Sequence, residues 1–278
     1  MDNNSIFIEK LRSSGLRPTK QRLEICKLLF DREKTFHFSI SDLRNILQDN
    51  LILHLDASNS SSFNSNNLIV WNDLSSSNND FTLKNGGITF SGDAGGSLVF
   101  DGNDYFCINP ISDLNTSNLT ISLWIKVTSV TNRNGVLVES SRTPTNIDDE
   151  FVFQVKENTG KLLFWDHDGS YGFNTQSSSS VLENPVAWKF VTFTKSGTTG
   201  KYYINTSLDA SITASHNVNY GSDWFCIGRE YRHDPDFANH STRYGFNGNM
   251  GAVYVYSSSL TQSEIEQNYN ATKSRYGY

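Results

Sequence analysis

Two short stretches of this sequence place aromatic rings beside carboxylate, imidazole and amide groups. One covers residues 165–171 and the other residues 231–240. A sugar is recognised by an aromatic ring that covers the apolar side of the sugar ring and by polar groups that meet its hydroxyls, so both stretches have the composition of a ligand-contacting loop. The candidate contact residues are Trp165, Asp166, His167, Asp168, Tyr171, Tyr231, His233, Asp234, Asp236 and His240.

The second stretch also fits two roles that involve no sugar. His233, Asp234, Asp236 and His240 are ligand types for a transition metal, although their spacing matches no known metal motif. A variable polar loop exposed to solvent accounts for the same residues without any ligand. Both alternatives stay open beside the sugar-contacting one.

Short strands are the elements expected to carry these stretches. Aromatic residues make up 13% of the 278 residues and charged residues only 19%, and polar turns separate the apolar runs. Residues 120–127 alternate, with Ile121 and Leu123 on one face and Trp124 on the other, so both faces of this strand should be covered. The expected strands are 96–100, 105–109, 119–127, 135–139, 151–156, 161–165, 188–195, 201–204, 224–227 and 251–256. Short strands joined by turns predict two stacked antiparallel sheets.

One short helix is predicted near the end of the chain, over residues 260–269. Thr261 is its expected N-cap, and Glu264 follows three residues later, which is the capping-box pattern. Ile265 and Tyr269 lie four positions apart and therefore share the face expected to pack on the sandwich.

The first 50 residues differ from the remainder in charge and in pattern. They carry nine Lys/Arg and seven Asp/Glu, a net charge of +2, and their apolar residues recur at helical spacing. Residues 51–278 carry fourteen Lys/Arg and twenty-two Asp/Glu, a net charge of −8. An acidic domain repels phosphate backbones, so nucleic acid is an unexpected partner for it. We expect a helical segment over residues 1–49 and a sandwich over residues 51–278.

Three motifs of the larger part carry a family resemblance: SLVFDGNDYF, TISLWIKV and FNGNMGAVYVYSSSLTQSEIEQNYN. They resemble the laminin-G-like branch of the concanavalin A-like lectin/glucanase superfamily, in the variant found in bacteriophage structural proteins. The resemblance implies a jelly-roll sandwich of two antiparallel sheets, a fold used mainly as a recognition scaffold. Because one fold hosts many functions, the ligand has to be argued from the residues themselves.

A second resemblance covers residues 1–47. LRSSGLRPTKQRLEICKLLF followed by FHFSISDL resembles the start of the ferric uptake regulator family, in which it forms the first helices of a winged helix-turn-helix. His37 matches a metal-ligating position of that family, but a single His supports no metal site. The recognition helix and wing do not follow, so no element is left to read a major groove.

The superfamily resemblance also suggests two possible functions, catalysis and calcium binding. A glucanase of the superfamily shows paired carboxylates in a Glu-x-Asp-x-x-Glu or Glu-x-Asp-x-Glu pattern, which this sequence lacks, so we do not expect an enzyme. Related modules bind Ca²⁺ at the rim of the sandwich, and Asp101, Asn103 and Asp104 are the candidate ligands. The alternative is a hairpin turn whose Asp and Asn side chains bond their own backbone.

The three cysteines form no disulfide framework. Cys107 and Cys226 lie in apolar runs, so buried free thiols are the expected state, with a Cys107–Cys226 bridge as the alternative. No secretory leader and no membrane-spanning run is expected from the sequence.

These observations favour a non-catalytic module that binds a glycan or another surface ligand, on a virion or an extracellular surface. One alternative is a purely structural virion module that contacts other virion proteins and no sugar. Another is a fragment of a transcription regulator, inferred from residues 1–47.

Overall fold

The computed structural model describes residues 45–85, 87–114, 117–130, 135–141, 149–168, 170–218, 224–229 and 244–278. The chain divides into two compact units, Met1–Asn45 and Ile46–Tyr278. The predicted N-terminal helices and His37 lie outside the described residues, so the predicted division into a helical segment and a sandwich stays a prediction.

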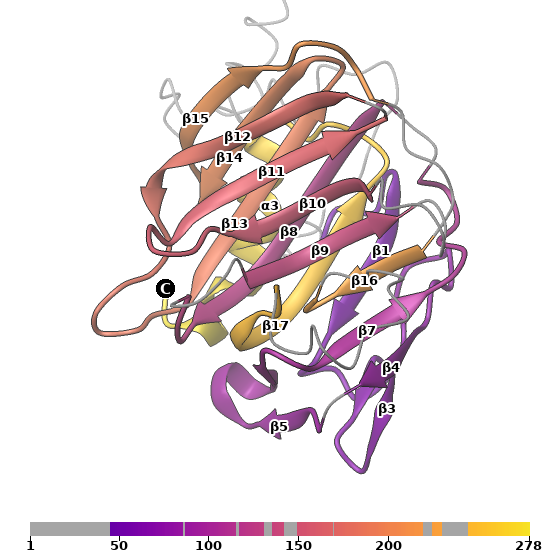
Figure 1. The fold of residues 1–278 in the computed structure, drawn as a ribbon. Coiled ribbons are helices and arrows are strands. Elements are labelled where there is room, and N and C mark those ends of the chain that lie inside the picture. The colour runs from indigo at the N-terminus through magenta and orange to yellow at the C-terminus, as the bar shows by residue number, and fades with distance from the viewer. Residues whose placement is uncertain are drawn as a thin grey trace, which may run out of the picture. The chain divides into compact units, whose positions relative to one another are not determined.

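Two antiparallel sheets stacked face to face form the described part of the second unit (Figure 1). One sheet has eight strands in the order β15-β14-β13-β8-β17-β6-β5, with β1 paired to β17. Its strands are β1 (Leu51–Asp56), β5 (Thr89–Ser91), β6 (Ser97–Asp101), β8 (Asn118–Val127), β13 (Lys189–Ser196), β14 (Thr199–Ile204), β15 (Ser207–Thr213) and β17 (Asn247–Tyr256). A short 3₁₀ turn, η2 (Asp93–Gly95), joins β5 to β6.

The other sheet has nine strands in the order β12-β11-β10-β9-β16-β7-β4-β3-β2. Its strands are β2 (Phe63–Asn64), β3 (Asn67–Trp71), β4 (Phe81–Asn85), β7 (Tyr105–Ile108), β9 (Gly135–Ser141), β10 (Asp149–Val155), β11 (Lys161–His167), β12 (Tyr171–Ser180) and β16 (Trp224–Ile227). The predicted two-sheet antiparallel sandwich is therefore confirmed.

Aromatic and branched side chains fill the space between the sheets. Phe164 of the nine-stranded sheet stacks on Phe193 of the eight-stranded sheet, with ring centroids 3.9 Å apart. On β8, Ile121 and Leu123 belong to this core, whereas Trp124 faces the other way and is equally buried. The prediction that both faces of this strand are covered is confirmed, because alternation turns every second side chain toward each face.

The C-terminal segment covers the outer face of the eight-stranded sheet. Helix α3 (Gln262–Thr272) has Thr261 as its N-cap and forms the predicted capping box with Glu264, and η4 (Lys273–Tyr276) follows it. Beneath this segment the Trp124 ring stacks on Tyr276, 4.0 Å between centroids, and on Tyr269, 5.4 Å between centroids. We call this group the covered aromatic cluster; its members are Trp124, Phe190, Tyr254, Tyr269 and Tyr276.

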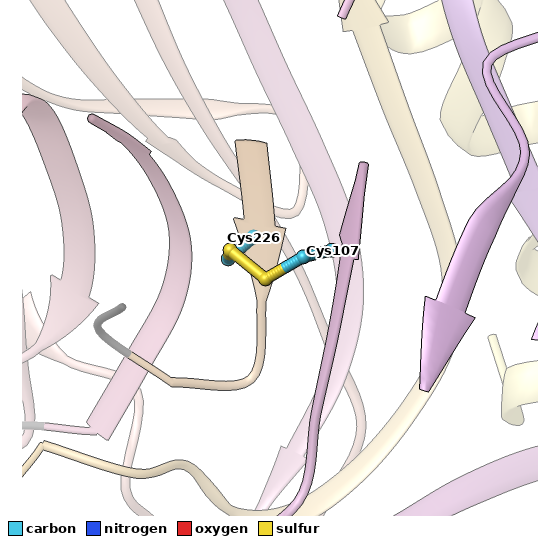
Figure 2. Close-up of a disulfide and its surroundings, with 2 residues drawn as sticks. All are labelled: Cys107 and Cys226. Atoms are coloured by element: carbon cyan, nitrogen blue, oxygen red, sulfur yellow. A yellow bond between two sulfur atoms is a disulfide. The ribbon is translucent and has the colours of Figure 1, made fainter. Parts of the chain in front are cut away.

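The expectation of free thiols is wrong, because Cys107 and Cys226 form a disulfide (Figure 2). The two residues are direct partners on neighbouring strands β7 and β16, with Cα atoms 4.2 Å apart. The prediction that both cysteines lie in apolar surroundings is confirmed, since both are buried beside Tyr105 and Trp224. The pairing follows from the register of two strands that lie far apart in the sequence, and no local pattern encodes that register.

Among the described residues, none of the helices has the length and apolar character needed to cross a membrane.

Candidate ligand-binding face

The first candidate stretch belongs to a hairpin at the edge of the nine-stranded sheet. β11 ends at His167 and β12 begins at Tyr171, so most of the stretch is strand rather than loop. Alternation along β11 buries Phe164 in the core and turns Trp165, which is half-buried, to the outer face of the sheet. The hairpin therefore presents every second residue of the stretch to a ligand.

Three rings meet on the outer face of this hairpin, and we call Trp165, His167 and Tyr171 the hairpin ring cluster. Tyr171 lies edge-on to Trp165, with centroids 5.9 Å apart at 82°, and to His167, with centroids 4.9 Å apart at 64°. Tyr171 is 55% exposed, the second-largest exposure among the large hydrophobic side chains of the described residues. Exposed rings held in fixed mutual orientation can cover the apolar side of a sugar.

Asp166 does not contribute to the outer face as predicted, because its side chain points into the sandwich and is fully buried. One of its carboxylate oxygens accepts the Phe173 N–H at 2.6 Å, and the other lies 3.8 Å from Nζ of Lys195. Burial lowers the pKa of Lys195 to about 8, although the negative charges of Asp166 and Asp168 act in the opposite direction. Asp166 and Lys195 therefore tie the hairpin to β13 of the opposing sheet.

Two further contacts hold the same hairpin against the eight-stranded sheet. The hydroxyl of Tyr202 accepts the Phe164 N–H at 2.8 Å and donates to the carbonyl of Thr175 at 2.6 Å. On the outer edge of β12, the carboxylate of Asp209 accepts the N–H groups of Ser178 and Ser179. The rings are thus displayed on a hairpin that is fixed from behind and along its free edge.

Asp168 is engaged by a neighbouring loop. Its Oδ1 atom lies 3.0 Å from Nε2 of His216, and the adjacent Ser215 hydroxyl donates to the Tyr171 carbonyl at 2.8 Å. Both partners of the Asp168–His216 pair are about one-third exposed, with 32% and 34% of the side-chain area accessible. Asp168 therefore stands at the rim of the ring cluster, where the pair orients the β11–β12 turn.

Sequence reasoning missed three amides on the same outer face: Gln154, Asn174 and Gln176. Asn174 is the cross-strand partner of Trp165, and Leu163 pairs with Gln154 on one side and Gln176 on the other. The signal was available, because residues two apart on a strand share a face, but the run of serines at the end of β12 hid the strand.

The candidate calcium turn joins β6 of one sheet to β7 of the other, so it is not the hairpin of the alternative interpretation, although its Asp side chains do bond the local backbone. Oδ1 of Asp101 accepts the Asn103 N–H at 2.7 Å, and Oδ2 of Asp104 accepts the Asp101 N–H at 3.0 Å. The side-chain amides of Asn85 and Asn247 donate to the carbonyls of Asn103 and Asp101, each at 3.4 Å.

One oxygen of this turn would suit a cation. Oδ1 of Asp104 is buried and has no hydrogen-bond partner within the described residues. Calcium takes six to eight oxygens, however, and over the same residues no three His, Cys, Asp or Glu side chains are grouped to hold a metal. Calcium at Asp101, Asn103 and Asp104 therefore stays a prediction.

The second candidate stretch, with Tyr231, His233, Asp234, Asp236 and His240, lies outside the described residues. Its predicted roles, in sugar contact or in metal binding, stay predictions.

Comparison with protein families gives one match, over residues 100–266, to a laminin-G-type model described as the concanavalin A-like lectin/glucanases superfamily. No curated protein sequence matches the chain. Among solved structures, domain 4 of AbnA, an extracellular GH43 arabinanase from Geobacillus stearothermophilus solved with arabinotriose, matches with a TM-score of 0.60 and 17% identity. The match covers 80% of this chain and 99% of that domain.

Two toxin domains are similar to a comparable extent. The binding domain of Paraclostridial Mosquitocidal Protein 1 matches with a TM-score of 0.59 and 17% identity, covering 81% of this chain and 52% of that one. The binding domain of botulinum neurotoxin DC, in complex with SialylT, has a TM-score of 0.55 and 15% identity, with coverage of 81% and 52%. The chain thus spans about half of each toxin domain, and at these identities the likeness shows the fold.

Proposed function

Because the chain belongs to the concanavalin A-like lectin/glucanases superfamily, we propose that it is a non-catalytic module that binds a glycan at a cell or particle surface. The observation that carries the proposal is the hairpin ring cluster of Trp165, His167 and Tyr171. Its rings lie together on an outer sheet face, and the contacts of Asp166 and Tyr202 fix the hairpin from behind. Rigid aromatic groups bind sugars well because little entropy is lost when they are covered.

The comparisons and the disulfide support the same function. An arabinanase domain solved with a trisaccharide and the binding domains of two toxins share this fold, although at low identity. The Cys107–Cys226 disulfide suits a protein that works in an oxidising setting, such as a surface or the extracellular medium.

The hairpin carboxylates support binding rather than glycoside hydrolysis. Hydrolysis needs two carboxyl groups facing one glycosidic bond, about 5–9.5 Å apart. Asp166 points into the core toward Lys195, and Asp168 is paired with His216. Neither is placed to serve as one of two acids across a sugar bound on the ring cluster.

The test is binding to an array of oligosaccharides, followed by titration of the strongest binder. Trp165→Ala and Tyr171→Ala should each weaken binding at least tenfold, because each removes a ring from the cluster. Phe90→Ala is the matched control, since Phe90 is a 38% exposed ring on β5 at the edge of the other sheet. The control should bind like the unmodified protein.

Two results would contradict the proposal. Absence of binding to every glycan would remove the function, and equal losses in all three variants would place the site elsewhere. Glu150 ends the acidic run 148–150, which is the nearest approach to paired carboxylates in this sequence. Release of reducing sugar that disappears in Glu150→Gln would instead make the protein an enzyme, because a carboxylate would then be needed for turnover.

A further inference from the structure

Lys195 and Asp166 form an ion pair inside the sandwich, between strands of the two opposing sheets. Nζ of Lys195 on β13 lies 3.8 Å from Oδ2 of Asp166 on β11, and both side chains are fully buried. Two positions earlier on the same strands, Phe193 and Phe164 stack in the core, so the ion pair shares the inner face with these rings. Taking two charges out of water is costly, and their mutual attraction often fails to offset the whole cost. A reaction that removes both charges would therefore be favoured at this position.

The carboxylate of Asp166 is held with one oxygen fixed and the other toward the amine. Oδ1 accepts the Phe173 N–H at 2.6 Å. A Cβ atom at Gly172 would lie 2.6 Å from the same oxygen, so a larger residue there would displace the carboxylate. Nζ of Lys195 also donates to the carbonyl of Val218, which fixes the amine. Two reactive groups that are fixed at short range in a buried site react far faster than the same groups in solution.

We propose that Lys195 and Asp166 condense into an isopeptide bond that links the two sheets covalently. One proton passes from the ammonium to Oδ2, which gives a neutral amine and a neutral carboxyl group. Nζ then forms a bond to Cγ, the bond from Cγ to Oδ2 breaks, and a second proton from Nζ leaves with Oδ2 as one water molecule. The amide nitrogen keeps the third proton, Oδ1 becomes the amide oxygen, and no oxidant or cofactor is consumed.

The surroundings of the pair supply what this step needs. Only a neutral amine attacks a carboxyl carbon, and burial lowers the pKa of Lys195 to about 8, which makes that form accessible near neutral pH. The Phe173 N–H stabilises Oδ1, where negative charge develops in the transition state. Asp168 acts electrostatically on Lys195 and lies 3.0 Å from His216, and both are about one-third exposed, so this pair can relay protons between the site and solvent.

The test is the intact mass of the protein, measured in denaturant after the disulfide has been reduced. The unmodified chain should be lighter than its sequence by one water molecule, and a proteolytic digest should contain a branched peptide that joins Lys195 to Asp166. Lys195→Arg keeps the positive charge, but a guanidinium stays protonated and is no nucleophile. This variant should therefore have the full sequence mass. The branched peptide identifies the two residues even if a variant fails to fold.

Lys189→Arg is the matched control, because Lys189 also forms an ion pair with a carboxylate. Its Nζ lies 2.6 Å from Oε1 of Glu183, closer than in the buried pair, but the Glu183 side chain is 43% exposed. An exposed pair keeps its water and its charges, so Lys189→Arg should leave the loss of one water unchanged.

Asp168→Asn tests the proton relay. A positioned acid–base group contributes about a hundredfold or more to a rate, so this variant should condense more slowly by that factor when its mass is followed over time in the folded state. An unchanged rate would contradict the relay.

Two results would overturn the isopeptide bond itself. A full sequence mass for the unmodified chain, after prolonged incubation of the folded protein, would leave Lys195 and Asp166 as an ion pair only. A loss of water that persists in Lys195→Arg, with no branched peptide at these residues, would place the dehydration elsewhere in the chain.

Discussion

The two sheets carry aromatic groups of similar composition on their outer faces, and they use them in opposite ways. On the eight-stranded sheet, Trp124 and its neighbours lie beneath α3 and η4, and the Trp124 side chain is fully buried. On the nine-stranded sheet, Trp165 is half-buried and Tyr171 is 55% exposed. The first group stabilises the fold, whereas the second remains accessible to a ligand.

On this sandwich, the role of an aromatic ring on an outer sheet face depends on whether the C-terminal helical segment covers it, and not on the residue type. Stacked rings bury apolar area wherever they meet. Once a chain segment covers them, that area contributes to folding and is lost to recognition. An uncovered cluster costs some folding stability but keeps apolar area for a partner.

The largest expected effect is on stability at the covered aromatic cluster. Trp124→Ala should reduce the free energy of unfolding by about 3–5 kcal/mol, because it leaves a large cavity. It also removes the 2.8 Å hydrogen bond from the indole N–H to Thr272. Trp165→Ala should cost about 1 kcal/mol or less, since that ring is partly solvated. Chemical denaturation measures both, and equal losses would erase the difference between the two faces.

A smaller effect at the covered face concerns alkaline pH. Burial, the largest cause, raises the pKa of Tyr254, Tyr256 and Tyr276 above the ordinary value. The unfolded chain releases these protons near pH 10 while the folded chain retains them, so their stabilising contribution is complete below pH 10 and is lost as pH rises further. The slope is about 1.4 kcal/mol per pH unit for each tyrosine.

Tyr254→Phe tests this assignment cleanly. The Tyr254 hydroxyl is buried and has no hydrogen-bond partner in the described part of the chain, so removing it breaks no such bond. Denaturation between pH 9.5 and 11.5 should give a shallower loss of stability in this variant, by up to ~1.4 kcal/mol per pH unit. An unchanged slope would mean that Tyr254 ionises equally easily in the folded and unfolded chains.

The smallest expected effect concerns the buried carboxylate of Asp104, in the turn between β6 and β7. Desolvation, the first cause, raises the pKa of Asp104, so the ionised carboxylate weakens folding at neutral pH. Asp104→Asn removes the charge and keeps an oxygen for the Asp101 N–H, and it should raise Tm by about 2–4 °C if the gain is about 1 kcal/mol.

If Ca²⁺ binds at this turn, Asp104→Asn should instead lower Tm when calcium is present, because it removes a charged ligand. Melts with added calcium and with a chelator separate the two cases, because a cation that binds only the folded chain raises its Tm. A calcium-dependent rise in the unmodified protein that Asp104→Asn abolishes would establish a cation site at this turn.

Features that depend on local spacing were predictable from the sequence. The alternation of residues 120–127 placed Ile121 and Leu123 in the core and Trp124 on the opposite face, and Thr261 with Glu264 predicted the helix cap. In each case the residues that decide the structure are neighbours along one element, so the periodicity of that element carries the information.

Features that depend on pairing between distant elements were not predictable. The contact of Asp166 with Lys195 follows from the stacking of β11 against β13, and the partner of Asn174 follows from the pairing of β11 with β12. β12 itself escaped detection because its exposed edge is polar, and serines resemble a loop. The position of Asn174 beside Trp165 could therefore be assigned only once the strand pairing was known.

The disulfide also changes how this protein responds to force. Cys107 and Cys226 are 119 positions apart, and β8 to β15 lie between them (Figures 1 and 2). Tension applied at the two ends of the chain passes through the sulfur–sulfur bond and bypasses that segment, which withholds about 400 Å of extension at roughly 3.5 Å per residue. Both strands of the hairpin ring cluster lie inside the bypassed segment. When the chain is stretched between its two ends, the segment that carries the hairpin ring cluster should thus stay free of tension while the strands outside the disulfide give way.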